Sequence, residues 1–347
     1  MNIVTPRWWY RRGGQKPAIA RALLTPLSWA WAGATARRMA RGRPVDPGIP
    51  VICVGNLTLG GTGKTPVVRE LARLMARAGL DVHILARGHG GRLAGPVRVD
   101  GASHTAAEVG DEALMMALDA PVWVARDRAA AALAAASAGA QILIMDDGHQ
   151  NPSVRKTLSL IVVDGETRDG EWPFGGGGVF PTGPLREPLS ASLARADAVV
   201  VLLPADLPAA DRDLLALFAG KPIVTAWLEP ATPPPSGPQI AFAGLGKPWK
   251  MERALKAVGC DLVEFVALPD HAIMREAALV SLARRAGEQG AGLVTSEKDW
   301  IKLGSAWRVR VTAWPVRVMF GDEDMLRRLL AGGTPTNALA PLLKPPP

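Results

Sequence analysis

The sequence is poor in cysteine, in aromatic residues and in long hydrophobic runs, and these shortages exclude several classes of protein. Only two cysteines, Cys53 and Cys260, occur in 347 residues, and neither has a CxxC partner. We therefore expect core thiols in a reducing compartment, without a disulfide framework or a cysteine-ligated metal. The uncharged stretch 22–36 has 15 residues and contains Pro26. A membrane-spanning helix needs about 20 apolar residues, so this stretch is too short to be one.

Acidic residues are absent from residues 1–45, which hold nine Lys and Arg residues. The rest of the chain carries 31 basic and 32 acidic residues, so this segment contributes +9 and the rest −1 to the net charge of +8. A basic body that would bind nucleic acid is excluded, and we expect no nucleic-acid partner. Arg and Trp residues around a modest apolar centre are typical of a helix in the membrane interface. A cationic helix that packs on the main domain is the alternative.

The stretch 51–65 (VICVGNLTLGGTGKT) organises the rest of the chain. A β-branched run leads through glycines into Lys-Thr, and residues 66–78 have helical periodicity. This order is typical of a phosphate-binding loop, in which backbone N–H groups surround phosphate oxygens at a helix N-terminus. Thr58 stands where the strict motif has glycine, and a glycine-rich turn without a ligand is the alternative. The predicted nucleotide-binding residues are Thr58, Leu59, Gly60, Gly61, Thr62, Gly63, Lys64 and Thr65.

A second motif follows the apolar run 142–145, which ends at Asp146. Four apolar residues and an aspartate form the Walker B arrangement, in which the carboxylate holds Mg²⁺ beside the P-loop. A strand-terminating Asp-Gly turn is the alternative. Strand and helix patterns alternate through this half of the chain. They predict an α/β fold of the P-loop NTPase type, with a mostly parallel sheet flanked by helices.

Composition divides the chain into five parts. The Pro-rich stretch 229–238 (EPATPPPSGP) is predicted to be a linker. The expected parts are a membrane-associating helical segment at 1–45, a P-loop domain at 46–228, this linker, a smaller C-terminal α/β subdomain at 239–334 and a disordered tail at 335–347. Loops as long as residues 165–189 are functional or disordered. Arg186 in this loop either braces charge on a phosphate or is an ordinary surface arginine.

Seven motifs stand in order along most of the chain: PVICVGNLTLGGTGKTPVV, RGHGG, VGDE, DDGHQN, PTGPLREP, LPDH and TSEKD. Together they resemble the tetraacyldisaccharide 4′-kinase family, the lipid A 4′-kinases of Gram-negative bacteria. The P-loop of that family also lacks the first glycine. The resemblance implies transfer of the ATP γ-phosphate to the 4′-hydroxyl of an acylated glucosamine disaccharide 1-phosphate. It also implies a location at the cytoplasmic face of the inner membrane.

The resemblance further implies a role for individual residues. Lys64 and the rest of 58–65 bind ATP, and Thr65 and Asp146 serve Mg²⁺. Asp111 of VGDE is the general base, and His271 of LPDH orients it. The residues implied near the substrate and phosphates are Glu112, Arg186 and Glu187.

The DDGHQN motif departs from the family pattern at its end. Many relatives have His at the final position, where this chain has Asn151, and His149 occupies the variable place. Asn151 can form hydrogen bonds but cannot carry charge. We predict that it lies near the substrate, and His149 is a possible substitute for the missing imidazole. We also expect Asp111 and His271 to meet in a cleft between the two α/β units.

Two other functions compete with this prediction. The first is a membrane-associated P-loop ATPase that acts as a switch or positioning protein. ATPases of that class carry a Lys directly before the Gly pair, and this chain has Leu59 there. The second is a soluble small-molecule kinase or an ATP-dependent ligase, which the basic, Trp-rich segment 1–43 disfavours.

Overall fold

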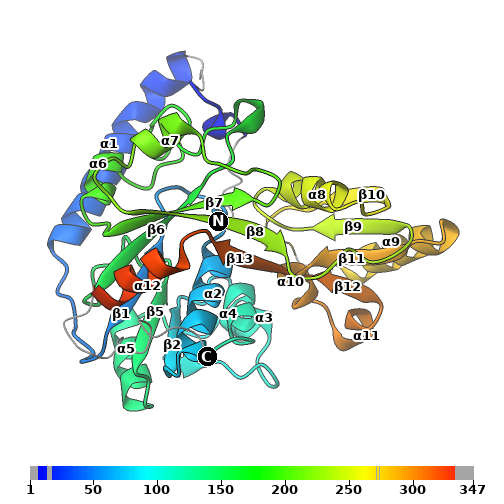
Figure 1. Ribbon diagram of the computed structural model, residues 1–347, viewed down its shortest axis with the longest axis horizontal. Helices are drawn as coiled ribbons and strands as arrows, with labels where there is room; N and C mark the ends of the chain where they lie inside the picture. The colour runs from blue at the N-terminus through cyan, green and yellow to red at the C-terminus, as the bar shows by residue number, and fades with distance from the viewer. Residues whose placement is uncertain (1–6, 14–17, 271, 273, 333–347) are drawn as a thin grey trace.

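The computed structural model describes residues 7–13, 18–270, 272 and 274–332. Within these residues the chain forms a nine-stranded sheet, in the order β13-β8-β7-β6-β1-β5-β2-β4-β3, and a four-stranded sheet, in the order β10-β9-β11-β12. Figure 1 shows the larger sheet in the centre, the smaller sheet on the right and helix α1 along the left side. The predicted α/β fold with two units is confirmed.

The larger sheet is parallel except at its two edges, where β3 and β13 run antiparallel to their neighbours. Its strands are β1 (Val51–Gly55), β2 (Val82–Ala86), β3 (Val97–Arg98), β4 (Val122–Val124), β5 (Ile142–Asp146), β6 (Leu158–Asp164), β7 (Ala198–Pro204), β8 (Ile223–Pro230) and β13 (Val316–Phe320). In the pairing of β1 with β5, Val54 lies opposite Asp146. Because parallel strands end at the same sheet edge, this register places the loop after β1 beside Asp146.

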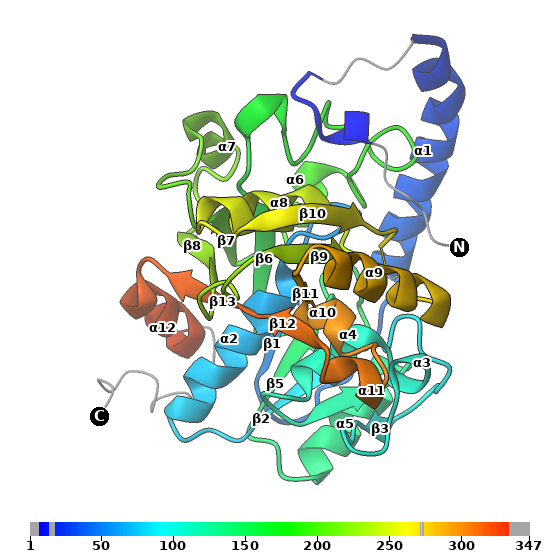
Figure 2. The same cartoon turned by 90° about the vertical axis from the view of Figure 1, so that its right-hand side faces the viewer.

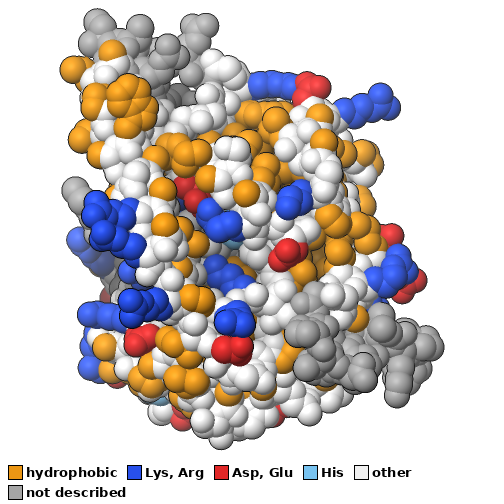
Figure 3. Space-filling model, turned by 90° about the vertical axis from the view of Figure 1, so that its left-hand side faces the viewer, with side chains coloured by type: hydrophobic (Ala, Val, Ile, Leu, Met, Phe, Trp, Pro, Cys, Tyr) orange, Lys and Arg blue, Asp and Glu red, His pale blue; other side chains and the backbone are white. Residues whose placement is uncertain are grey.

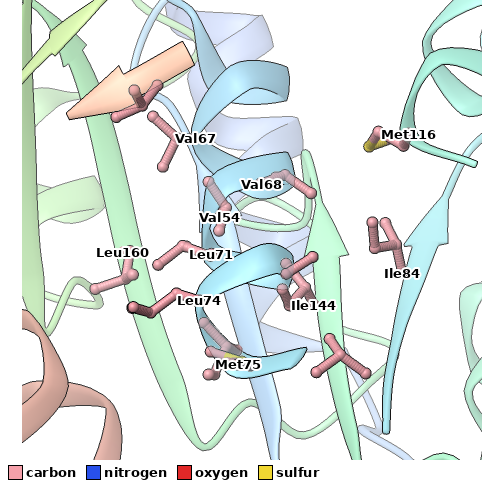
Figure 4. Close-up of a cluster of buried hydrophobic side chains, with 14 of the residues drawn as sticks. Val54, Val67, Val68, Leu71, Leu74, Met75, Ile84, Met116, Ile144 and Leu160 are labelled. Carbon is pink, nitrogen blue, oxygen red and sulfur yellow. The ribbon is translucent and has the colours of Figure 1, made fainter. Parts of the chain in front are cut away.

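Helices cover the faces of this sheet. They are α2 (Lys64–Arg77), α3 (Ala106–Val109), α4 (Asp111–Met116), α5 (Arg128–Ser137), α6 (Leu189–Leu193), α7 (Arg212–Ala216) and α12 (Glu323–Gly332), with 3₁₀ turns η1 (Arg7–Tyr10) and η2 (Arg168–Gly170). Helix α2 buries Val67 and Leu71 against strand residues that include Val54, Ile144 and Leu160 (Figure 4). Each fully buried Val or Leu contributes about 1.5–3 kcal/mol, so this contact fixes α2 on the sheet.

The smaller sheet belongs to a second subdomain with its own apolar core. Its elements are β9 (Gln239–Ala243), α8 (Pro248–Ala257), β10 (Leu262–Ala267), α9 (Glu276–Glu288), β11 (Gly292–Ser296), α10 (Glu297–Trp300), α11 (Ser305–Arg308) and β12 (Val311–Trp314). All of its strand pairs are parallel. Phe242 and Leu282 are buried in a cluster that contains no residue of the first sheet.

The expected boundaries of this subdomain were wrong at both ends. Strand β13 pairs with β8 in the larger sheet, and Leu326 and Leu330 of α12 are buried in the first core. The chain therefore returns to the first domain after β12. Glu229 and Pro230 end β8 and do not belong to a linker. Both errors have one cause, because the pairing joins residues that are 86 to 94 positions apart and leaves no local signal. The predicted tail 335–347 lies outside the described residues.

Helix α1 (Ala18–Ala40) has an unusual distribution of side chains. Ser28 and Thr35 are buried against the protein, whereas Leu23, Leu27 and Trp29 are 73%, 57% and 72% exposed. Figure 3 views the molecule from the side that carries α1, and hydrophobic side chains stand at the upper left of this view with Lys and Arg side chains below them along the left edge. None of the helices that the structure describes is long and apolar enough to cross a membrane.

Candidate functional site

The loop between β1 and α2 has the backbone of a phosphate-binding loop. Gly60 and Gly63 adopt φ values of 93° and 80°, which glycine tolerates because it has no Cβ. Helix α2 begins at Lys64. The first N–H groups of a helix have no partner within it and carry the positive end of the helix dipole. The predicted strand, loop and helix are confirmed, and the loop offers an anion site.

The first half of this loop explains why the strict motif's glycine is absent. Thr58 forms an antiparallel bridge with Leu185, and the Leu59 N–H donates to Pro184 O at 2.8 Å. The Arg186 N–H donates to Leu57 O at 2.9 Å. Thr58 therefore lies in a short extended ladder, where any residue fits and glycine has no advantage. The same ladder orders the PTGPLREP loop along the P-loop.

Asp146 ends β5 beside the P-loop and is buried. Its Oδ1 atom has no hydrogen-bond partner among the residues that the structure describes. Burial and the nearby charge of Glu112 raise the pKa of Asp146 to about 7. A buried carboxylate oxygen that lacks a protein donor is a suitable ligand for a divalent cation. The residues present therefore fit Mg²⁺.

The next residue, Asp147, has the opposite surroundings. It forms ion pairs with Lys64 Nζ at 3.4 Å and with Arg186 at 3.0 Å. Although burial opposes ionisation, these two cations hold the pKa of Asp147 well below its usual range. Arg186 Nε also donates to Thr58 O at 3.0 Å. The Arg186 side chain therefore packs on the phosphate loop, and its predicted contact with a phosphate stays a prediction.

Sequence reasoning missed Asp147 and Arg128. The only signal for Asp147 was the second Asp of DDGHQN. Arg128 starts α5, and its guanidinium donates to the backbone oxygen of Asp146 at 3.1 Å. Burial lowers the pKa of Arg128 to about 10, and its Nη1 has no hydrogen-bond partner in the described part of the chain. No local pattern marked this arginine, because its partner Asp146 stands 18 residues further along the chain, at the end of the next element.

His149 of DDGHQN has a structural position. Its ring nitrogens lie 3.0 Å from Ser159 Oγ and 3.0 Å from Ser192 O. Burial and the charge of Arg195 lower the pKa of His149 to about 4, so the ring is neutral at physiological pH. His149 is therefore a neutral, buried side chain and does not supply a charged imidazole in place of Asn151.

Asn151 and Glu187 both contact protein groups. The Asn151 side-chain oxygen accepts hydrogen bonds from Ser153 N at 2.8 Å and Ser153 Oγ at 2.7 Å. Glu187 accepts from Gln150 Nε2 at 3.0 Å and from Arg195 at 2.5 Å. These hydrogen bonds fix the orientation of both side chains. Their predicted contacts with substrate stay predictions.

The VGDE motif is held by close contact between two loops. A Cβ on Gly110 would lie 2.6 Å from His89 O, and one on Gly91 would lie 2.6 Å from Glu108 O. Only glycine permits this approach of RGHGG to VGDE. Helix α4 then begins at Asp111, which is buried, and its Oδ1 accepts from the Glu112 N–H at 2.9 Å.

The second subdomain reaches this acidic pair through helix α10 of TSEKD. Lys298 Nζ lies 3.7 Å from Glu112 Oε1 and 3.2 Å from Asp270 Oδ1. Helices α10 and α4 are in contact, and Figure 2 shows them from the side of the second subdomain. Asp270 directly precedes His271, which lies outside the described residues. The Asp111–His271 contact therefore stays a prediction, although the structure brings their two motifs together.

A second contact between the subdomains involves the loop after β9. Lys247 and Lys250 form ion pairs with Asp164 at 2.9 and 2.6 Å. A Cβ on Gly246 would lie 3.2 Å from Gly61 N, so the loop after β9 borders the phosphate loop. Sequence reasoning missed this contact, since neither lysine belongs to a motif on which the resemblance rests.

The N-terminal segment also reaches the phosphate loop. Tyr10 is buried and donates its hydroxyl hydrogen to Leu59 O, and Lys247 lies 4.8 Å above its ring centroid. Trp31 of α1 donates to Arg186 O at 2.9 Å. Residues 1–45 therefore include side chains that pack on the main domain, as the alternative prediction proposed, together with the exposed apolar face of α1.

Known proteins resemble this chain over nearly its whole length. The family model described as tetraacyldisaccharide-1-P 4′-kinase matches residues 20–333. A protein of Phenylobacterium zucineum (strain HLK1) named tetraacyldisaccharide 4′-kinase is 64% identical over 332 residues, which cover 96% of this chain and 100% of the relative. A protein of Caulobacter sp. (strain K31) with the same name is 62% identical over 330 residues, covering 95% and 98%. The crystal structure of LpxK from Aquifex aeolicus in complex with ATP matches with a TM-score of 0.70 and 27% identity, covering 90% and 99%.

Proposed function

This chain belongs to the tetraacyldisaccharide 4′-kinase family, and we propose that it transfers the γ-phosphate of ATP to the 4′-hydroxyl of a tetraacylated glucosamine disaccharide 1-phosphate. It is a kinase of lipid A biosynthesis. The observation that carries the specific reaction is the position of the adjacent carboxylates of Asp111, which is buried, and Glu112, which is half-buried. Glu112 influences the pKa of Asp146 at the phosphate loop. One site thus holds both a nucleotide pocket and a carboxylate for the acceptor.

The nucleotide is proposed to bind at residues 58–65. Backbone N–H groups and Lys64 bind the phosphates, and Arg186 supplies a second cation on the same side. Thr65 and Asp146 would hold Mg²⁺, whose charge offsets the negative charge that the phosphoryl oxygens carry during transfer. The support for this is the buried Asp146 oxygen, which has no hydrogen-bond partner among the described residues, and the ATP in the crystal structure of the Aquifex aeolicus relative.

Asp111 is proposed to be the general base. A sugar hydroxyl is a poor nucleophile at neutral pH, so a carboxylate within hydrogen-bond reach has to accept its proton. The position of Asp111 at the start of α4 suits this role, because the tight RGHGG contact fixes the backbone on which it stands. His271 would orient the carboxylate from the second subdomain.

The protein is proposed to act at the cytoplasmic face of the inner membrane. Each CH₂ group of a buried acyl chain is worth about 0.8 kcal/mol, so the acceptor lipid does not leave the bilayer readily. Helix α1 exposes Leu23, Leu27 and Trp29 and ends in basic residues. An apolar face flanked by cations suits the boundary between acyl chains and anionic head groups.

The proposed reaction is tested with radiolabelled ATP and the acylated disaccharide 1-phosphate in mixed micelles, followed by separation of lipid from free phosphate. We expect label in the lipid, at the 4′ position, and none with Lys64→Ala. Release of free phosphate without labelled lipid would instead support an ATPase that acts as a switch. Labelling of a water-soluble sugar but not of the lipid would support a soluble kinase.

A further inference from the structure

Lys298 is a buried cation from the second subdomain at the acidic pair of the first. Its side chain is only 14% exposed, and its ammonium lies 3.2 Å from Asp270 and 3.7 Å from Glu112. It therefore joins the VGDE motif to Asp270 of the LPDH motif, and among the described residues no backbone hydrogen bond connects these two motifs. The proposed function gives Lys298 no role, either in phosphate binding or in proton transfer.

The charges around Lys298 explain why a cation is needed there. Asp111, Glu112 and Asp270 surround it, and Asp146 lies close enough for Glu112 to influence its ionisation. Although burial opposes the charged form, Glu112, Asp111 and Asp270 raise the pKa of the Lys298 ammonium above its ordinary value. Without this cation, several carboxylates would stand together where a triphosphate has to bind, and like charges repel strongly at low dielectric.

The neighbours of Lys298 hold it in place by separate contacts. Glu297 forms a two-pronged ion pair with Arg69 of α2, at 2.5 and 3.0 Å. Asp299 accepts from the Gly244 N–H at 2.8 Å and pairs with Lys302 at 2.6 Å. Glu297 thus ties α10 to the P-loop helix and Asp299 ties it to its own subdomain. Lys298 lies between these two residues in sequence, and its ammonium points toward Asp111 and Glu112.

We propose that Lys298 is a positioning residue of the transfer reaction, which holds Asp111 and Glu112 against Asp270 and balances their charge on the acceptor side. This rests on the proposed function. In this proposal the second subdomain contributes two residues to the site: His271, which orients the base Asp111, and Lys298, which places a positive charge beside it.

The test compares Lys298→Met, Lys298→Arg and the wild type in full-length protein, with radiolabelled ATP and the acylated disaccharide 1-phosphate. Losing a hydrogen-bonded charge contact in the site should lower kcat about 10- to 100-fold. The KM for ATP should change little, since Lys298 does not belong to the phosphate loop. Lys298→Arg keeps the charge and should recover most of kcat.

Lys250→Met is the matched control, because it also removes a lysine ion pair between the subdomains, with Asp164 at 2.6 Å. It should lower the melting temperature as Lys298→Met does but keep most of kcat. Equal kcat in Lys298→Met and wild type, no recovery in Lys298→Arg, or an equal loss in Lys250→Met would each overturn the inference. If Lys298→Met does not fold, Lys298→Gln takes its place. A wild type that labels no lipid would refute the proposed function instead.

Discussion

The proposed nucleotide side and the proposed acceptor side of this site are built in different ways. The nucleotide side comes from one domain: a continuous loop, the end of β5 beside it and the PTGPLREP segment that pairs with the loop. The acceptor side needs both subdomains, because Lys298 and Asp270 approach Asp111 and Glu112 from the second one. Backbone register and the ion pairs of Asp147 within one domain hold the first side together, whereas ion pairs between the two subdomains hold the second.

This difference has a consequence for how the two sides fail. A sheet register cannot shift by a fraction of a residue, so the nucleotide side is rigid. Buried ion pairs depend on each partner, since removal of one leaves an uncompensated charge. Substitutions on the acceptor side should therefore impair transfer while ATP still binds. Substitutions on the nucleotide side should impair both ATP binding and phosphoryl transfer.

The largest expected effect is that of Lys64→Ala on the nucleotide side. A cation that stabilises a transferred phosphoryl group is worth about 10³–10⁵-fold in rate, so labelled lipid should fall to background. Asp147 would also lose one of its two cations. The measurement is initial rate at saturating substrates, with circular dichroism as a folding control. Near-normal activity would remove the P-loop assignment.

On the acceptor side, Asp111→Ala should lower kcat about 10²–10⁴-fold, the usual contribution of a general base. ATP affinity, measured by calorimetry, should stay near that of the wild type. His271→Ala should lose somewhat less. Residues that act as a unit are not additive, so the double variant should be little worse than Asp111→Ala. Multiplicative losses would show that the two residues act independently.

Binding of the lipid acceptor can be weakened by substitutions that lie outside the site. Changing Leu23, Leu27 and Trp29 to Ser removes the exposed apolar face of α1 but spares the contacts of Tyr10 and Trp31 with the loops. Membrane binding, measured by vesicle co-sedimentation, should weaken about 10- to 100-fold for the lost apolar area. The KM for lipid should rise and the KM for ATP should not. Deletion of 1–43 is a poorer test, because it also removes the loop contacts, and unchanged sedimentation of the triple variant would place the anchor elsewhere.

The smallest effect should be one of stability. Folded Asp146 keeps its proton to about pH 7, whereas an unfolded aspartate loses it near about pH 4. Its contribution to stability is therefore fully present below about pH 4 and lost as the pH rises through 7. Without nucleotide, Asp146→Asn should melt roughly 2–5 °C higher at pH 8. The wild type should gain more from Mg²⁺ and ATP, and a lower melting temperature of the variant in their absence would contradict this account.

Local sequence was enough wherever the structure depends on neighbouring residues. The strand, glycine loop and helix at 51–78 were readable, because positive φ, helix starts and apolar periodicity each leave a local pattern. Asp146 was readable for the same reason, as the end of an apolar strand. The motif order also sufficed to identify the family, which the comparisons confirm.

Only the tertiary structure determined which charged side chains form ion pairs with each other. No pattern in the chain pairs Asp147 with Arg186, Lys247 with Asp164, or Lys298 with Glu112. The return of β13 to β8 was hidden for the same reason. The side-chain pattern of a strand repeats every two residues and that of a helix every 3.6. Both patterns can therefore be recognised within a short stretch of sequence. An ion pair between segments many residues apart depends on where two finished elements meet, and only the folded packing of the two subdomains determines that.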